Sequence, residues 1–477
     1  MKKAELVFIP VAAAGHLIPQ IEFAKRLLDR DDRFSVTVLV MQSPSFTSLA
    51  AAYAKSLAES NTPIRFINLP PPIHFRPSQE VHKSLEKFAT EFADYHKASV
   101  KEAIVNHVVS NSNSAPLAGL VIDMFCTSMI DVGNELGVPS YLFFTCNAAY
   151  LSLSLYLPSR QDEVGREFEV FDSELVIPGY VNPVPSSGLP EVLLNKNGGY
   201  TTAVNHGRRF KETKGIIINS FEELESHAVK CLLNDFDHLP PVYTVGPLID
   251  LKGESNKTDS NEILKWLDNQ PDLSVVFLCF GSMGSFGEEQ LKEIALGLEQ
   301  SEHRFLWSIR EPPPKNELEG PSDYKLDELL PAGLLERTKE IGMVCKWAPQ
   351  KEILAHKSVG GFVSHCGWNS SLESLWFGVP IVTWPMYAEQ QMNAFQMVKD
   401  LGVAVELRLD YRSMSGEVVL GDEIARAIKC VMEIDNEVRK KVREKSEQSR
   451  LAVKEGGSSF TAFQRLIDDI CINLETN

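Results

Sequence analysis

The sequence predicts an α/β protein built from two doubly wound domains that face each other across a cleft. The first observation is length, because 477 residues exceed what one hydrophobic core normally holds. The second is that apolar strand-like runs alternate with amphipathic helical patterns in both halves, which is typical of parallel sheets covered by helices on both faces. The third is a polar stretch, rich in turn-forming residues, that separates the halves after residue 246.

The first half contains five apolar runs that we expect to form strands, with helical patterns between them. The first run, LVFIPV, turns at Gly15 into an amphipathic helix with the sequence HLIPQIEFAKRLL. A longer helical pattern spans residues 79–109. The strands expected in this half are residues 6–11, 35–40, 64–69, 117–122 and 140–144.

The alternation restarts after the polar stretch. A charged, Pro-rich insertion at residues 311–326 is expected to form a surface loop. The strands expected here are residues 274–280, 304–309, 342–345, 360–364 and 381–384. The expected helices are residues 288–300, 390–399 and 422–434. The chain then divides into a first domain (1–245), a linker (246–262), a second domain (263–455) and a C-terminal helix (456–477).

Composition argues against several classes of protein. Lys and Arg number 47 and Asp and Glu 64, so the formal net charge of −17 would repel nucleic acid and anionic membranes. The eight cysteines are scattered without a CxxC pair. This pattern favours buried thiols in a reducing compartment over disulfides or a metal site.

The N-terminal segment superficially resembles a short signal peptide. Lys2 and Lys3 precede an apolar run, and residues 12–14 resemble a cleavage site. Pro10 interrupts that run, however, and the same residues also fit a buried strand followed by a helix. No stretch approaches the ~18 to 20 apolar residues that a membrane span needs. We therefore expect a cytoplasmic protein without stable membrane insertion.

The most informative pattern lies within residues 347–391. An expected strand, GGFVS, is followed by a tight turn, HCGW (residues 365–368), and by a helix expected to begin at Asn369 and Ser370. A strand, turn and helix in this order point free backbone N–H groups and the positive end of the helix dipole at the space above the strand. Gly367 permits a close backbone approach. The pattern predicts a diphosphate site that needs no Walker lysine.

An acidic side chain follows on the same helix. Glu373 lies one turn beyond Ser370, where a carboxylate suits ribose hydroxyls. The alternative is a capping box formed by these two residues, which needs no ligand. That alternative leaves the gathering of His365, Trp368 and Trp347 around the same turn unexplained.

A second glycine-rich turn, FGSMGSFG, occupies residues 280–287 between an expected strand and an expected helix. It matches neither GxGxxG nor GxxxxGK[ST], and a simple tight turn is an equally good interpretation of it alone. In a cleft with two sides it is a candidate second contact for the phosphates, with Ser282 as the donor.

Two polar residues of the first half form a candidate catalytic pair. His16 follows the first expected strand, and Asp123 ends the strand GLVID, so both lie at carboxyl ends of strands, where ligands bind in such folds. A histidine with a carboxylate behind it is a general base held in one tautomer. A lone histidine at a helix start is more often structural, so the prediction depends on the pairing.

Residues 347–390 resemble the signature segment of plant secondary-product UDP-glycosyltransferases, with a WAPQ opening, an HCGWNS centre and an EQ close over 44 residues. The resemblance extends over the whole chain, including the early GH, the FGS turn and the GGSS at residues 456–459. The chain is most similar to the subfamily that acts on flavonoids, isoflavonoids, triterpenes and simpler phenolics. The resemblance implies the GT-B fold of two Rossmann-like domains. It further implies acceptor binding by the first domain, UDP-sugar binding by the second, inversion at the anomeric carbon, and no metal or other cofactor.

The resemblance also implies roles for individual residues, with His16 as the base and Asp123 as its partner. For uracil and ribose it implies Trp347, Ala348, Gln350 and Glu373. For the diphosphate it implies Ser282, His365, Gly367, Asn369 and Ser370. For the sugar and its surroundings it implies Thr145, Trp368, Tyr387, Glu389 and Gln390. Gln at position 390 accompanies glucose in similar enzymes, whereas His there often accompanies galactose.

The acceptor pocket is expected in the first domain, and the sequence indicates its residues less clearly than those of the UDP-sugar site. For any single phenylalanine, packing in the core is the more ordinary interpretation. The candidates are His16, Phe88, Phe92, Phe125, Phe144, Tyr200 and Ala388.

The C-terminal segment predicts an amphipathic helix after the break at Gly456 and Gly457. In similar enzymes the last helix packs back on the first domain, and the alternative is that it packs only on the second. A monomer is expected. The apolar stripe of this helix consists of Phe460, Phe463, Leu466, Ile467 and Ile470.

The expected reaction is a single displacement that moves glucose from UDP-glucose to a hydroxyl group of a small lipophilic acceptor. His16 would take the acceptor proton, a contribution of ~100- to 10,000-fold to such reactions. Four alternatives stay open: a UDP-sugar epimerase of the same overall fold, a different UDP-sugar donor, a nicotinamide-dependent oxidoreductase and a non-catalytic sugar-nucleotide sensor. A nicotinamide-dependent oxidoreductase is expected to have GxGxxG after the first strand, where this chain has PVAAAG. The presence of both His16 and Asp123 argues against a non-catalytic sensor.

Overall fold

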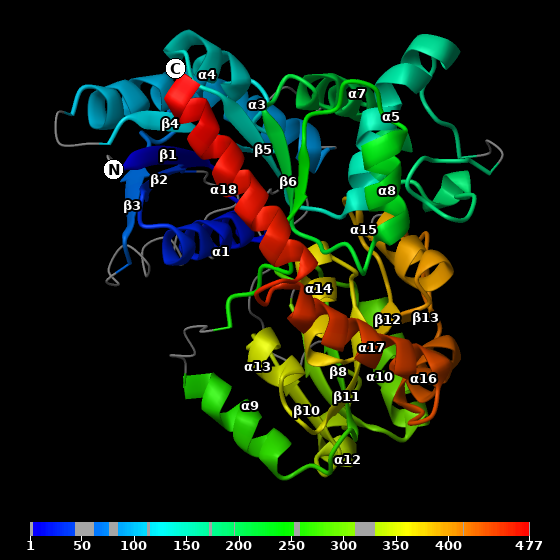
Figure 1. The fold of residues 1–477 in the computed structure, drawn as a ribbon. Coiled ribbons are helices and arrows are strands. Elements are labelled where there is room, and N and C mark those ends of the chain that lie inside the picture. Colours follow the sequence, from blue (N-terminus) through cyan, green and yellow to red (C-terminus); the bar gives the residue numbers. More distant parts are fainter. Residues whose placement is uncertain are drawn as a thin grey trace.

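The computed structural model of the chain places two α/β units one above the other (Figure 1). In that view the first half of the chain forms the upper unit, and most of the second half forms the lower unit. The structure describes residues 3–42, 62–75, 84–111, 115–170, 174–194, 196–251, 258–310, 330–413 and 415–476.

In the described part of the chain, the upper unit contains a parallel sheet of seven strands covered by helices. Its strands are β1 (Ala4–Ile9), β2 (Phe34–Val40), β3 (Ile64–Asn68), β4 (Leu117–Asp123), β5 (Ser140–Phe144), β6 (Gly215–Ile218) and β7 (Val242–Thr244). Its helices are α1 (Ala14–Arg30), α3 (Leu85–Ile104), α4 (Met129–Leu136), α5 (Ala148–Val164), α6 (Glu191–Leu194), α7 (Gly199–Phe210) and α8 (Ser226–Asn234). Two short helical elements, η2 (Val105–Val109) and η3 (Ser186–Gly188), complete the unit.

The lower unit contains, among its described residues, a parallel sheet of six strands. Its strands are β8 (Val275–Cys279), β9 (Arg304–Ser308), β10 (Gly342–Cys345), β11 (Val359–Ser364), β12 (Ile381–Thr383) and β13 (Ala404–Glu406). Its helices are α9 (Thr258–Asp268), α10 (Glu288–Ser301), α12 (Leu334–Thr338), α13 (Gln350–Leu354), α14 (Trp368–Phe377), α15 (Gln390–Phe395), η4 (Gln396–Asp400), α16 (Gly421–Met432) and α17 (Glu437–Ala452), and α18 (Ser458–Thr476) follows them.

The two sheets share one topology. The upper order is β3-β2-β1-β4-β5-β6-β7, and the lower order is β10-β9-β8-β11-β12-β13. In each sheet the first strand of the unit lies beside its fourth, and the strand order reverses between them. Ligands of open parallel sheets bind at the carboxyl ends of the strands at such a switch point. The crevices are therefore expected after β1 and β4 in the upper unit, and after β8 and β11 in the lower unit.

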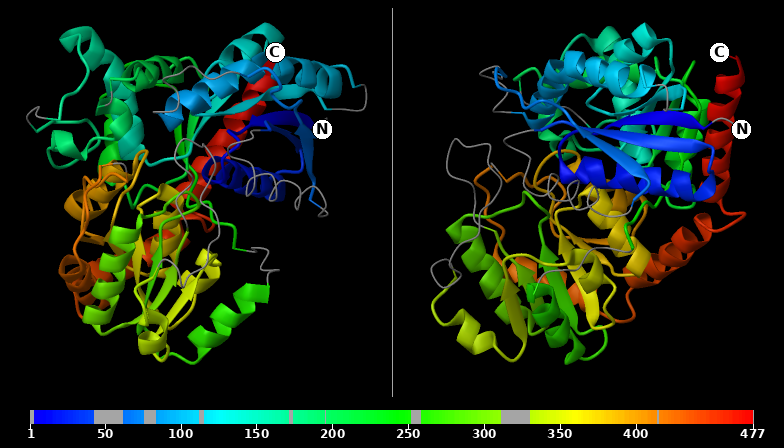
Figure 2. Two further views of the ribbon diagram at one scale, coloured as in Figure 1. Left: turned by 180° about the vertical axis from the view of Figure 1, so that it is seen from behind. Right: turned by 90° about the vertical axis from the view of Figure 1, so that its left-hand side faces the viewer.

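The C-terminal helix α18 crosses from the lower unit and lies along the upper one in every ribbon view (Figures 1 and 2). Arg30 of α1 donates from Nη1 to the carbonyl oxygen of Phe460 at 3.0 Å, and its guanidinium lies 3.7 Å from the centre of that ring. The side chains of α18 buried in the core shared by β1 and α1 are Phe463, Leu466, Ile467 and Ile470.

The predicted α/β fold class is confirmed, and the expected strands agree with the observed ones to within a few residues. Three short strands, β6, β7 and β13, were not predicted, because apolar runs of three or four residues carry too little periodicity. Helix α9 begins inside the expected linker, since the TDSN run that reads as turn-forming also contains residues that favour helix starts. The loop expected at 311–326 and residues 79–83 of the expected helix lie outside the described residues.

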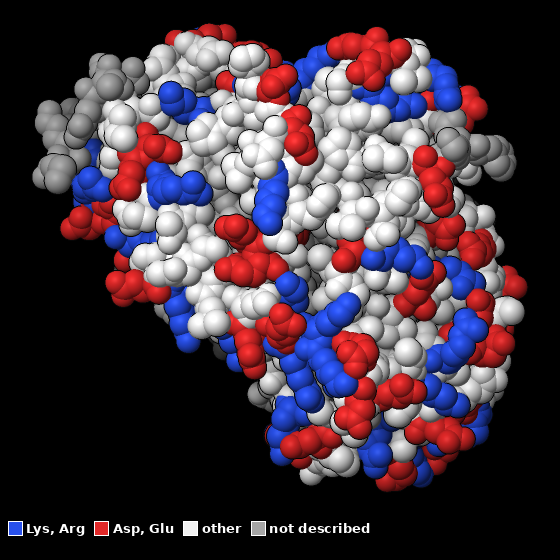
Figure 3. Space-filling model, turned by 45° about the vertical axis from the view of Figure 1, so that its right-hand side comes forward, with Lys and Arg blue, Asp and Glu red and all other residues white. Residues whose placement is uncertain are grey.

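Charged side chains of both signs are interspersed over the face shown in Figure 3, where they are densest on the lower unit. On this face neither sign of charge is gathered into a single patch. Among the described helices, none has the length and apolar character needed to cross a membrane. The apolar run near the N-terminus is instead β1, a buried strand in the middle of the upper sheet.

Candidate active site

The topology brings His16 and Asp123 together although 107 positions separate them in the sequence. His16 lies in the first turn of α1, just after β1, and Asp123 is the last residue of β4, the neighbour of β1 in the sheet. The distance between Nδ1 of His16 and Oδ2 of Asp123 is 2.9 Å. The predicted pair is therefore in hydrogen-bonding contact at the switch point of the upper sheet.

The Asp123 carboxylate is held rigidly. It is fully buried, and it also accepts hydrogen bonds from Nε2 of Gln20 at 3.0 Å and from the backbone N–H of Phe125 at 3.1 Å. Because a carboxylate only accepts, Nδ1 of His16 is assigned the proton, and Nε2 is left as the acceptor. The His16 side chain is 21% exposed.

Opposing influences set the pKa of His16. Burial lowers it, but the charge of Asp123, the hydrogen bond to Asp123 and the charge of Glu389 together outweigh burial and raise the pKa above its ordinary value. Thr145, which follows β5, places Oγ1 3.3 Å from Nδ1 of the same ring.

Glu389 belongs to the lower unit, where it is the N-cap residue of α15. Burial raises the pKa of its carboxyl, while its own backbone and the nearby charge of His16 favour the ionised form. Nδ2 of Asn393 donates to Oε1 of Glu389 at 3.2 Å. The charges of His16 in the upper unit and Glu389 in the lower unit thus influence each other's pKa.

The predicted strand, turn and helix occur as β11, residues 365–367 and α14, with Gly367 as the N-cap. The helix begins at Trp368, one position before the predicted start, and the N-cap has no side-chain hydrogen bond. The capping-box alternative for Ser370 and Glu373 is therefore wrong, because both residues lie inside the helix. The N–H groups of the first turn are left without a capping side chain at the carboxyl end of β11.

Ser370 and Glu373 share a partner instead. Nε2 of Gln350 donates to Oγ of Ser370 at 3.0 Å and to Oε2 of Glu373 at 2.7 Å. Burial raises the pKa of Glu373 to about 7 in spite of that hydrogen bond. The structure thus brings together three of the residues predicted to contact the nucleotide.

The ring of His365 lies between the two glycine turns. A Cβ atom on Gly281 or on Gly367 would come within 2.6 Å of Nε2 of His365, and Gly281 has a φ of +75°, so both positions require glycine. Burial lowers the pKa of His365 to about 4, with the Cys279 backbone opposing, so its imidazole is neutral at pH 7. Ser282, next to Gly281, is exposed.

Trp368 and Asn369 connect the two units. Nε1 of Trp368 donates to the carbonyl oxygen of Asn219 at 2.7 Å, and Nδ2 of Asn369 donates to the carbonyl oxygen of Gly15 at 2.9 Å. Nδ2 of Asn219 lies 3.4 Å from Oδ1 of Asn369. Sequence reasoning missed Asn219, which directly follows β6. The signal that could have found it is the run GIIINS, a short apolar strand ending in polar residues.

Gln390 is buried, and its Oε1 accepts hydrogen bonds from the backbone N–H groups of Met386 at 3.0 Å and Tyr387 at 3.2 Å. Its oxygen therefore fixes the loop before α15. Ala388 in that loop has a φ of +54°. Just before α13, Trp347 is half-buried, and Ala348 packs against the lower core.

The aromatic acceptor candidates separate into two groups. The ring centre of Phe125 lies 5.4 Å from that of His16 and 6.0 Å from that of His206, which the sequence did not single out. The other four are buried within core clusters, where packing accounts for them. These are Phe88, Phe92, Phe144 and Tyr200.

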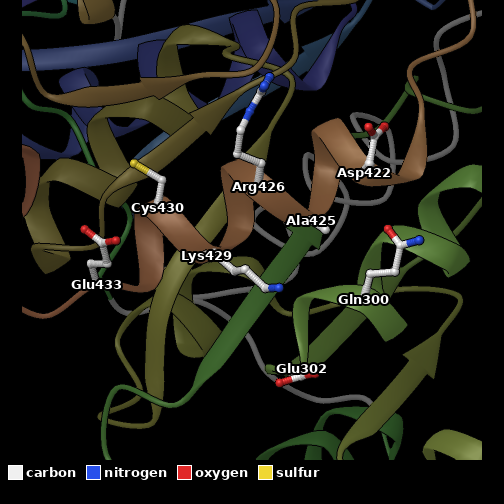
Figure 4. A pocket seen from close by; sticks show the side chains of 8 residues that line it. All are labelled: Gln300, Glu302, Asp422, Ala425, Arg426, Lys429, Cys430 and Glu433. Carbon is white, nitrogen blue, oxygen red and sulfur yellow. The ribbon is translucent and has the colours of Figure 1, made fainter.

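A surface hollow of ≈ 670 Å³ lies apart from these residues, between the end of α10 and α16 (Figure 4). Its labelled side chains spread apart rather than converging on one point. They are Gln300, Glu302, Asp422, Ala425, Arg426, Lys429, Cys430 and Glu433. None of them was predicted to bind a ligand. Within the described residues, no three His, Cys, Asp or Glu side chains are grouped so as to hold a metal ion.

The chain resembles known proteins over nearly its whole length. Residues 217–445 match the family described as "UDP-glucoronosyl and UDP-glucosyl transferase". The chain is 54% identical to UDP-glycosyltransferase 71K1 of Malus domestica, with 98% of this chain and 99% of the relative covered. It is 50% identical to the putative UDP-glucose flavonoid 3-O-glucosyltransferase 3 of Fragaria ananassa, at 98% and 100% coverage. The crystal structure of Medicago truncatula UGT71G1 complexed with UDP-glucose superposes with a TM-score of 0.89, at 47% identity and 98% coverage of both chains.

Proposed function

Since the chain belongs to the UDP-glucuronosyl and UDP-glucosyl transferase family and has its GT-B fold, we propose that it transfers glucose from UDP-glucose to a hydroxyl group of a small lipophilic acceptor. The acceptor class we propose is flavonoids, other phenolics and terpenoids, and the names of the relatives support the flavonoid part of it. We further propose that the reaction inverts the anomeric carbon and needs no metal ion.

One observation carries the proposal: His16, in the first turn of the helix after β1, contacts Asp123, the last residue of the neighbouring strand β4. With Nδ1 protonated, Nε2 of His16 is the atom that accepts the proton of the acceptor hydroxyl. Asp123 then stabilises the imidazolium, which is favoured by the raised pKa of His16. The activated oxygen attacks the anomeric carbon, and the bond from that carbon to UDP breaks on the opposite side.

The leaving diphosphate gains negative charge as its bond to the sugar breaks. The N-terminal N–H groups of α14 are donors fixed by the helix and suited to that charge, and we propose that the hydroxyl of Ser282 and the ring of His365 line the same site. Donors that are already in place need no reorganisation during the reaction. This arrangement supports departure of UDP without a cation.

The test is to incubate the purified chain with UDP-glucose and a panel of phenolic and terpenoid alcohols in excess EDTA, and to identify products by mass. We expect acceptor glucosides, with lower catalytic efficiency for UDP-galactose, since an unpaired polar group at the 4-position costs ~1 to 3 kcal/mol. A parallel reaction without acceptor distinguishes an epimerase, which would convert the UDP-sugar by itself. Failure to glucosylate any alcohol, or activity that returns only with added Mg²⁺ or Mn²⁺, would contradict the proposal.

A further inference from the structure

A chain of buried polar side chains crosses the interface between the two units behind the candidate site. Its members are Asn147, Asn393, Gln396 and Glu225, and each is at most 2% exposed. Asn147 and Glu225 belong to the upper unit, whereas Asn393 lies in α15 and Gln396 begins the π-helical turn η4 of the lower unit. Buried polar groups are costly unless they are paired, so this cluster requires its partners to be in place.

Asn147 is the centre of the cluster. Its Oδ1 caps α5 by accepting from the N–H of Tyr150 at 2.7 Å. Its Nδ2 donates to Oδ1 of Asn393 at 2.8 Å and to Oε1 of Gln396 at 3.0 Å. Both hydrogens of this amide are therefore used to reach the lower unit.

The neighbouring groups allow only one orientation of each amide. Gln396 donates from Nε2 to the Glu225 carboxylate at 2.9 Å, so its oxygen faces Asn147. Asn393 donates from Nδ2 to the carbonyl oxygen of Cys366 at 2.9 Å and to Glu389 at 3.2 Å, so its oxygen also faces Asn147. Flipping any amide would set acceptor against acceptor.

The two ends of the cluster anchor it to fixed backbone and to the site. Glu225 accepts from the backbone N–H groups of Ala148 and Ala149, at the start of α5. At the other end, Asn393 contacts Cys366 in the turn before α14 and Glu389 beside His16. Asn147 itself lies two positions after Thr145, which approaches the His16 ring.

We infer that Asn147, Asn393, Gln396 and Glu225 form a cross-domain lock that holds the Glu389 carboxylate and the turn before α14 in register with His16. Asn147 and Asn393 are then positioning residues of the transfer reaction, and this role rests on the proposed function. The helix widens to a π-turn at Gln396, a distortion that is frequent at functional sites.

The test variant is Asn147→Ser, because serine caps a helix as well as asparagine does but has no amide to donate. Asn182→Ser is the matched control: Asn182 is exposed and also reaches the lower unit, with Nδ2 2.8 Å from Oδ1 of Asp400. We expect Asn147→Ser to lower kcat about tenfold, because Glu389 and the turn before α14 are no longer held in register with His16. The Kd for UDP, measured by calorimetry, should stay within about twofold, and Asn182→Ser should leave both quantities within about twofold.

Two results would overturn the positioning role. One is a kcat for Asn147→Ser within about twofold of wild type. The other is a loss that Asn182→Ser reproduces, or that is matched by weaker UDP binding, since either would indicate a general effect on the interface.

A second measurement keeps the lock testable without turnover. Asn147→Ser and Gln396→Met are combined in a double-mutant cycle on the melting temperature. We expect the melting temperature of the double variant to fall by less than the sum of the two single decreases, because both substitutions remove the hydrogen bond between Asn147 and Gln396. If the wild-type protein transfers no sugar, the proposed function fails, and the double-mutant cycle then tests the lock independently. Additive shifts in melting temperature would overturn the lock, and non-additive shifts would support it.

Discussion

The upper and lower units contribute to the candidate site in different ways. On the upper side, the proposed chemistry depends on one imidazole and one carboxylate that come from distant parts of the chain and meet because β1 and β4 are neighbours. On the lower side, most predicted contacts come from a single run, residues 347–390, and many of them are backbone groups around a helix start. Under the proposed function, catalysis is therefore concentrated in two residues of the upper unit, whereas nucleotide binding is distributed over many residues of the lower unit. Single substitutions should therefore act very unequally on the two sides.

The largest effect is expected from His16→Ala. Loss of the base should lower kcat by ~10² to 10⁴ on weakly acidic hydroxyls, whereas the Kd for UDP should barely change because the donor side is intact. Steady-state kinetics measures the change in kcat, and calorimetry measures the Kd for UDP. His356→Ala is the control, since that histidine pairs with Ser358 and Asp268 away from the cleft. Turnover of an aliphatic alcohol within a few-fold of wild type would show that His16 is not the base.

Asp123→Asn is expected to lower kcat by a factor toward the lower end of the ~10² to 10⁴ that a general base contributes, because the amide no longer fixes the tautomer of His16. It should also move the pH profile. Asp123 raises the pKa of His16 while burial lowers it, so removing the carboxylate lets burial dominate and the pKa falls. The base works in its neutral form, so the acidic limb of kcat/KM should shift to lower pH. If the acidic limb of the profile does not shift, Asp123 does not control the pKa of His16.

A substitution in α18 tests whether the upper unit can be destabilised without a change in the lower unit. Ile467 is 1% exposed in the upper core, whereas Ile472 on the same helix is 57% exposed. Ile467→Ala should lower the free energy of unfolding by ~2 to 5 kcal/mol, and Ile472→Ala should change it by less than about 0.5 kcal/mol. Removing residues 456–477 should destabilise the chain and weaken catalysis as well. Equal melting temperatures for the two isoleucine variants would contradict this account of α18.

The smallest effect is expected from Glu373→Gln, about three- to tenfold in the Kd for UDP, since other contacts remain. Its effect on stability depends on pH. The folded pKa of Glu373 is about 7, above the ~4.3 of an unfolded chain. The stabilising contribution of its protonated form is therefore lost as pH rises through about 7. Melting curves should show Glu373→Gln gaining stability over wild type at pH 8 and losing that gain near pH 5. A gain of equal size at both values would mean that ionisation of Glu373 is not its source.

The lower side was more readable from sequence because its residues are close together in the chain. A strand, an HCGW turn and a helix specify their own geometry locally, and only the helix start differed, since Gly367 rather than a serine is the N-cap. The His16–Asp123 contact also followed from the sequence, because parallel topology places both residues at strand ends.

Contacts between the units were not predictable in the same way. Asn219 and Asn147 follow β6 and β5, and their contacts with Trp368 and Asn393 form only when the second unit docks against the first. Nothing in a single segment encodes that docking. His206 was missed for a related reason: its partners Thr90 and Thr127 come from other segments, at 2.8 and 2.9 Å. Burial lowers the pKa of His206 to about 4, which keeps it neutral beside Phe125.

The central claim is that an acceptor oxygen activated by His16 displaces UDP in one step across the cleft. The most direct measurement is the anomeric configuration of the first-formed glucoside, followed by proton NMR during the reaction in excess EDTA. UDP-glucose carries its sugar in the α configuration, so the account predicts a β-glucoside with one UDP released for each product. An α-glucoside as the first product would require two displacements or a different attack geometry, and would contradict it.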